Sequence, residues 1–233
     1  MTKDELDRLT IVKEVCSLTD ASLQEIYNFI KTGYATIVGY IDEPKTANPA
    51  DGVYIVFNDG TYVEASKADN ELTDEDNAAV AGIAIKQGDR ALVVALRDCA
   101  DGKDITLTVA EDETEAKSRY IDTYIDAVAD WDGKGNTKHL RQIGLNPAIE
   151  LEPGQWVPSM AEMYLIYTNR KAINAALRKV GGTEIPGKWY LTSTEISATG
   201  AWRLYLVAGY LRWYTKASTK GRVRPVSAFI FNR

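Results

Sequence analysis

The stretch AWRLYLVAGYLRWYTK, residues 201–216, carries the clearest pattern in the chain. On both sides of Ala208-Gly209, large apolar residues alternate with tyrosine, arginine or valine. Because successive strand residues point to opposite faces, the alternation predicts a β-hairpin. Five apolar positions are predicted to face the core: Trp202, Leu204, Leu206, Leu211 and Trp213. The opposite face is predicted to be exposed and carries Arg203, Tyr205, Val207, Tyr210, Arg212 and Tyr214.

Tyrosine and arginine offer large, rigid side chains with polar tips, and they are enriched where proteins bind partners. An exposed face of this composition has no structural use of its own. The hairpin therefore predicts a binding surface.

The composition is that of a globular protein, with 233 residues, 45% of them hydrophobic and 26% charged. No apolar stretch is long enough for a transmembrane helix, and the charged N-terminus does not resemble a signal peptide, so we expect no membrane insertion. Cys16 and Cys99 are expected to be reduced and buried, with one disulfide as the alternative.

The charge is divided unevenly along the chain. From Pro186 to the end, eight basic residues face only Glu195, a net charge of +7, whereas residues 1–185 carry −13. This asymmetry indicates either an anionic partner for the basic end or two ends that complement each other within the fold. The sequence pI near 5.0 argues against nucleic acid as the partner.

The N-terminal part is predicted to be separate. An amphipathic helix at 20–31 and a strand at 36–41 precede a linker at 42–52 that contains two prolines. We therefore divide the chain into an attachment or oligomerisation segment, residues 1–48, and a ligand-binding domain, residues 49–233.

Short strands dominate the first half of this domain. The pattern predicts a hairpin at 53–64 that turns at Asn58-Asp59-Gly60, a second pair at 80–85 and 91–96, and a strand at 104–109. Residues 183–233 are predicted to be entirely β.

Helices are predicted between these β regions. Residues 115–131 place Ile121, Tyr124, Ile125 and Val128 at helical spacing, and Thr137 is the expected cap of a short helix. Ser159 and Glu162 form a capping box after Pro158. Asn169 is expected to open a further helix that turns Ile173, Ala176, Leu177 and Val180 inward and ends at Gly181-Gly182.

The usual signatures of catalysis and cofactor binding do not occur. The sequence has no glycine-rich phosphate loop, no nucleophile elbow and no zinc motif, and its only histidine, His139, is expected at the surface. Asp130, Asp132 and Asn136 offer oxygen atoms around two glycines, which is a weak pattern for a cation. We expect no enzyme activity, no cofactor and no metal.

Several motifs of the C-terminal half occur together in one known family. They are GQWVPSMAEMY (154–164), INAALRKVGG (173–182), WYLTSTE (189–195), AW (201–202) and RVRPVSAF (222–229). In this combination the chain resembles the C-type-lectin-fold variable proteins of diversity-generating retroelements, found in gut Bacteroides-type bacteria and their phages. The resemblance covers about residues 51–233. It departs from the family at Val157 and at Leu191-Thr192, where the usual residues differ.

The resemblance implies an α+β, C-type-lectin-like fold of short antiparallel strands with two or more helices. It also implies that residues 188–220 are hypervariable, because in this family codons are rewritten at adenines between the STE and RVRPV motifs. The implied ligand contacts are Tyr190, Arg203, Tyr205, Val207, Ala208, Tyr210, Arg212, Tyr214, Ala217 and Thr219. The nine contacts from Arg203 to Thr219 pass the test of being reachable from an asparagine codon by changing adenines. Trp202 and Trp213 fail this codon test. Leu204, Leu206 and Leu211 pass it although they are predicted to face the core, so the test by itself does not identify contact residues.

For Trp189 and Tyr190, a structural role in the fold is favoured over contact with a ligand, although Tyr190 is kept among the predicted contacts. Arg222 and Arg224 are predicted to fix the last strands through hydrogen bonds. Calcium-dependent lectin motifs are absent. Formylglycine-generating enzymes share the implied fold but rely on C-terminal cysteines, whereas Cys16 and Cys99 lie far upstream.

The function predicted from the sequence is non-enzymatic binding of a cell-surface protein or glycan, with a homo-oligomer as one possible state. The expected location is a phage tail tip or a bacterial surface. Two alternatives stay open: a structural subunit of a virion or surface appendage that uses the aromatic face as an interface, and an oxidase or hydrolase on the same fold.

Overall fold

The computed structural model describes residues 49–68, 78–110 and 120–230, which belong to one contact unit, Pro49–Ile230. The predicted helix at 20–31, the strand at 36–41 and Cys16 lie outside the described residues, and the predicted division into two domains stays a prediction. In chain order the elements are β1 (Gly52–Phe57), β2 (Tyr62–Glu64), β3 (Val80–Gln87), β4 (Arg90–Val94), η1 (Cys99–Gly102), α4 (Tyr124–Val128), α5 (Gly133–Ile143), β5 (Gln155–Trp156), α6 (Met160–Lys179), β6 (Trp189–Glu195), β7 (Gly200–Tyr205), β8 (Tyr210–Thr215) and β9 (Val226–Ser227).

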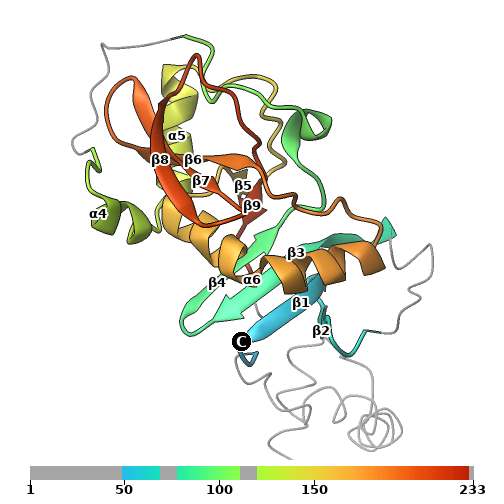
Figure 1. Cartoon of the computed structure of the whole chain (residues 1–233). Coiled ribbons are helices and arrows are strands. Elements are labelled where there is room, and N and C mark those ends of the chain that lie inside the picture. Colours follow the sequence, from blue (N-terminus) through green and yellow to red (C-terminus); the bar gives the residue numbers. More distant parts are fainter. Residues whose placement is uncertain (1–48, 69–77, 111–119, 231–233) are drawn as a thin grey trace, which may run out of the picture. The chain divides into compact units, whose positions relative to one another are not determined.

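Two antiparallel sheets form the framework (Figure 1). The larger has the strand order β2-β1-β3-β4-β9-β5, and the smaller has the order β6-β7-β8. The first two predicted hairpins are confirmed: β1 pairs with β2 across Asn58-Asp59-Gly60, and β3 pairs with β4. Asp59 accepts hydrogen bonds from both the amide and the hydroxyl of Thr61, which stabilises the first turn.

Helix α6 lies between the two sheets, in contact with β1 and β3 of one and with β6 and β7 of the other (Figure 1). The predicted capping box is confirmed, since Ser159 and Glu162 exchange hydrogen bonds at its N-terminus. The helix is uninterrupted, so the prediction of a new helix at Asn169 is wrong. The side-chain amide of Asn169 instead donates to the backbone carbonyl of Leu165 one turn earlier, so this polar residue is accommodated inside the helix.

Other element predictions need correction. The cap of α5 is Asp132, whose carboxylate accepts from the Gly135 amide, and Thr137 lies inside the helix. Residues 104–109 make only isolated bridges at Ile105 and Thr108 instead of a strand. Of the helix predicted at 115–131, residues 115–119 lie outside the described part, and within 120–131 the helix is limited to α4.

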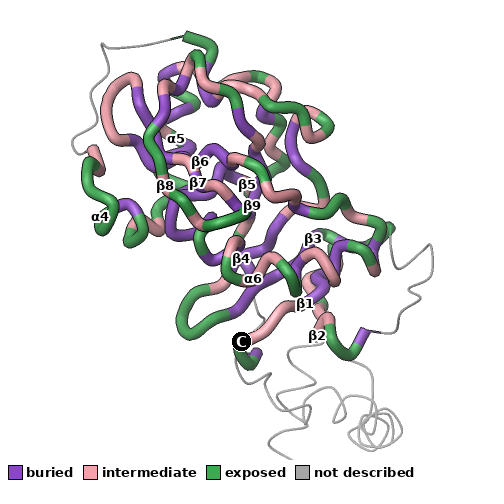
Figure 2. Tube along the Cα trace, in the orientation of Figure 1, coloured by how far each residue is buried: buried purple, intermediate pink, exposed green. Residues whose placement is uncertain are grey.

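Buried side chains form two cores, one on each side of the smaller sheet. The first core unites β1, β3, β4 and α6 with Tyr190, Trp202 and Leu204. The second core packs α5 against Leu191, Ala201 and Tyr214 of the sheet. Figure 2 shows that β7 is largely buried and that the turn after it is exposed. The fold is therefore α+β with antiparallel sheets, as predicted.

Candidate binding face on the smaller sheet

The register of β6, β7 and β8 places the predicted binding residues in rows. Trp189, Tyr205 and Tyr210 form one row, because Trp189 pairs with Tyr205 and Tyr205 pairs with Tyr210. Arg203 and Arg212 are direct partners in the next row. Since paired residues project to the same side of a sheet, these five side chains share one face. We call Trp189, Arg203, Tyr205, Tyr210 and Arg212 the hairpin face.

Exposure along this side of the sheet falls with distance from the turn. Tyr210 is 64% exposed and Arg212 is exposed, whereas Trp189, Arg203 and Tyr205 are half-buried. Farther from the turn the second core covers the same side of the sheet. The sequence therefore predicted the correct side for each residue of β7 and β8, but only the end near the turn is open.

Tyr214 is the main consequence of this covering. Its side chain is 2% exposed in the second core, and its hydroxyl donates to the carbonyl of Thr192. Burial raises the pKa of this phenol well above its usual value. The prediction that Tyr214 contacts a ligand is corrected: it is a core residue.

Tyr190 is corrected in the same way. It projects to the other side of β6, is fully buried in the first core, and donates its hydroxyl to Asp98. Burial, followed by the charge of Asp98, raises the pKa of this phenol. Asp98 also accepts hydrogen bonds from Arg222 and Arg224, at 3.2 and 2.5 Å. The predicted anchoring role of these two arginines is thus confirmed.

Trp213 departs from the prediction in the opposite direction. It pairs with Trp202 and shares its side of the sheet, but its side chain is 61% exposed whereas Trp202 is buried. Trp202 is covered by α4 and the segment before it: its ring lies 5.0 Å from that of Tyr124 in α4, and its indole donates to the carbonyl of Ile121. Trp213 is on the edge strand β8. Its expected place in the core is wrong.

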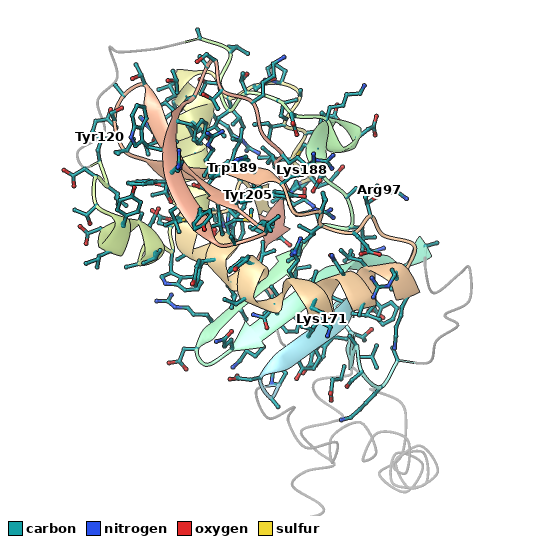
Figure 3. The ribbon with its side chains drawn as sticks, viewed as in Figure 1. Arg97, Tyr120, Lys171, Lys188, Trp189 and Tyr205 are labelled. Atoms are coloured by element: carbon teal, nitrogen blue, oxygen red, sulfur yellow. The ribbon has the colours of Figure 1, made fainter. Side chains whose placement is uncertain are left out.

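Ring and guanidinium planes pack against one another within the hairpin face. The ring centroids of Trp189 and Tyr205 are 5.0 Å apart, with 32° between the planes, and the guanidinium of Arg203 lies 4.3 Å from the Trp189 ring centroid. Figure 3 shows Trp189 and Tyr205 together beside Lys188. Such contacts hold large side chains in place before any partner arrives, which lowers the entropy cost of binding.

The tip of the hairpin adds exposed apolar area. Val207 is 57% exposed and Ala208 is exposed, and Gly209 completes the turn with a φ of +71° that favours glycine. A side chain at Gly187 would collide with Val207, so the turn packs closely on the preceding loop. Ala217 and Thr219, the remaining predicted contacts, are half-buried in the segment after β8.

No carboxylate in the described part of the chain pairs with the positive charges on the hairpin face or with the neighbouring Lys188. Within the described residues, Arg203, Arg212 and Lys188 form no ion pair, and the only carboxylate of residues 186–233, Glu195, is 2.5 Å from Lys216. The Arg203 Nε is buried and has no hydrogen-bond acceptor there. Burial lowers the pKa of Arg203, and the positive charge of Arg212 lowers it further.

The carboxylate oxygens of the weak cation pattern accept hydrogen bonds from the scaffold. Asp130 accepts from Asn136 and Thr194, and Asp132 caps α5. Residues 49–68, 78–110 and 120–230 contain no cluster of three metal-ligating side chains.

His139 is half-buried instead of lying at the surface, with its Nε2 3.6 Å from Glu195. Cys99 is buried and forms no disulfide within the described residues, and burial raises the pKa of its thiol to about 12.

The fold and this face describe an α+β domain with an exposed aromatic and basic surface. No family model matches the chain, and no curated protein matches it. Among solved structures it is similar to a fimbrial protein from Bacteroides ovatus, with a TM-score of 0.55 and 14% identity. The match covers 76% of this chain and 48% of the fimbrial protein, so the chain spans about half the length of that protein. At an identity of 14%, this similarity shows the fold alone. No helix among the residues described is both long and apolar enough to cross a membrane.

Proposed function

We propose that this chain is a non-enzymatic binding protein of a cell or virion surface, an adhesin-like protein that recognises its partner through the hairpin face. One observation carries the proposal: Trp189, Tyr205, Tyr210, Arg203 and Arg212 lie side by side at an open end of the smaller sheet. These residue types dominate the binding energy of protein interfaces. The similarity to a fimbrial protein supports a surface role.

The motifs that suggested a C-type-lectin-like variable protein mostly serve the scaffold. In the TSTE sequence, Thr192 donates to the Trp202 carbonyl, Ser193 to the Val157 carbonyl and Thr194 to Asp130. We propose that this scaffold is of the C-type-lectin type and that residues 188–220 are diversified by a retroelement. The proposal is supported by the location of exposed and half-buried positions such as Arg203, Tyr210 and Arg212 between two rigid motifs.

The binding role is tested with the full chain, fluorescently labelled, on a panel of intact bacterial and mammalian cells by flow cytometry. We expect saturable binding to a subset of the panel and at least about a tenfold loss for the double variant Tyr210→Ala/Arg212→Ala. Arg141→Ala, on the exposed surface of α5, is the matched control and should bind as the unmodified chain does.

Both variants should melt at the temperature of the unmodified chain, because each altered side chain is exposed. Equal binding by the double variant and the control would refute recognition by the hairpin face. Binding to no cell of the panel would equally count against the adhesin-like role. Diversification has a separate genetic test: a nearby near-copy of the 3′ coding region that differs chiefly at adenines, beside a reverse transcriptase gene.

A structural subunit is the second candidate, favoured by the exposed Trp213 and by the fimbrial neighbour. In that case the aromatic surface joins copies of the chain. Light scattering separates the two roles: a monomer supports the binding protein, and an oligomer that Trp213→Ser dissociates supports the subunit.

A further inference from the structure

We propose that Arg203 and Arg212 form a subsite for a side-chain carboxylate in an acidic, extended segment of a partner protein. The inference rests on the proposed binding role of the hairpin face and names the chemistry that this face recognises.

The first argument is the unbalanced charge of the pair. Arg203 and Arg212 are direct cross-strand partners, and like charges in such positions repel. The nearby basic residues of the C-terminal region form ion pairs with other carboxylates: Lys216 pairs with Glu195, and Arg222 and Arg224 pair with Asp98. Within the described part of the chain no carboxylate pairs with either arginine of the hairpin face. An anion placed there would relieve the repulsion.

The second argument is the unused donor. The Nε of Arg203 is buried and finds no acceptor among the residues that the structure describes, although buried polar atoms are nearly always hydrogen-bonded. The guanidinium is held over the Trp189 ring, at 4.3 Å, so its orientation is fixed. A guanidinium fork in a fixed orientation matches the two oxygens of a carboxylate.

The third argument selects a polypeptide over an acidic sugar. β8 is an edge strand, because the smaller sheet ends with it. No backbone hydrogen bond from the residues described reaches its outer side between Tyr210 and Tyr214. An open edge provides a row of backbone donors and acceptors that an extended peptide can satisfy. Val207 and Ala208 add exposed apolar area at the turn, as protein interfaces require.

The experiment follows the Nε–Hε NMR signal of Arg203 in the full chain labelled with ¹⁵N-arginine, assigned by its loss in Arg203→Lys. The probes are blocked tri-glutamate, blocked tri-glutamine, trigalacturonate and sodium sulfate, all at one ionic strength. We expect a saturable shift with tri-glutamate and none with tri-glutamine. Arg212→Gln should weaken the tri-glutamate affinity about tenfold, whereas the matched control Arg141→Gln should leave it unchanged.

The remaining outcomes overturn the subsite. A sulfate response equal to that of tri-glutamate would show general screening of charge, and a stronger response to trigalacturonate would assign the face to acidic glycans. No response to any probe would remove the carboxylate subsite. Because Arg212 is exposed, its variant keeps the test valid even where changes at Arg203 disturb folding. Failure here with cell binding intact refutes the subsite alone, whereas loss of cell binding specificity refutes the proposed function.

Discussion

Tyr210 and Tyr214 show how two tyrosines on one side of one strand acquire opposite roles. They are four residues apart in β8 and project to the same side, yet one is 64% exposed and the other 2%. The difference arises from α5 and Leu107, which pack against the sheet only at the end away from the turn. A tyrosine is therefore a contact or a core residue according to what lies above it.

The two tyrosines predict contrasting effects on stability. Tyr214→Ala should lower the free energy of unfolding by about 3–5 kcal/mol, because it leaves a cavity in the second core. Tyr210→Ala should change the free energy of unfolding by less than about 0.5 kcal/mol, because the ring is solvated. Urea denaturation followed by circular dichroism measures both, and similar values for the two variants would contradict the register.

At the scale of elements, the N-terminus of α6 joins several segments. Glu162 accepts hydrogen bonds from the Ser159 amide, at 2.7 Å, and from the Trp156 indole, at 3.0 Å. A side chain at Gly133 would collide with Trp156 and with the Ser159 amide, so α5 begins with a glycine in contact with this site. The helix start that the sequence predicted as a local capping box is also a tertiary junction.

This junction predicts a pH dependence of stability. Burial raises the pKa of Glu162 from 4.5 to about 7, despite the opposing effect of the hydrogen bonds it accepts. Between these values the folded chain binds more proton than the unfolded chain, so the free energy of unfolding falls as pH rises from 4.5 to 7. The contribution is at most about 3 kcal/mol.

Denaturation curves at several pH values test this contribution. Glu162→Gln keeps the capping geometry and should remove this part of the slope. Glu152→Gln, at an exposed position, should retain the slope of the unmodified chain. Identical pH profiles for Glu162→Gln and the unmodified chain would contradict the assignment.

At the scale of the whole molecule, Asp98 ties the two sheets together. It follows β4 of the larger sheet and binds Tyr190 of the smaller sheet and two arginines of the final segment. Arg224 is fully buried and also donates to the carbonyls of Ala95 and Thr183. One carboxylate thus compensates a buried positive charge and fixes β6, on which Trp189 of the hairpin face lies.

Removing this carboxylate should affect the whole domain. Asp98→Ala should lower the free energy of unfolding by about 3–5 kcal/mol, because Arg224 then stays buried without its counter-charge. The exposed Asp122→Asn is the control and should be near neutral. Chemical denaturation decides the matter, and a near-neutral Asp98→Ala would show that the network does not hold the sheets together.

The sequence by itself determined the hairpins, the capping box of α6 and the side of the sheet on which each hairpin residue lies. These features depend on local turn chemistry and on the two-residue period of a strand. Only the tertiary structure decided which of those residues are open to a partner, because coverage depends on segments far away in the chain. α5 buries Tyr214, Asp98 binds Tyr190 from about ninety positions earlier, and the edge position of β8 leaves Trp213 exposed.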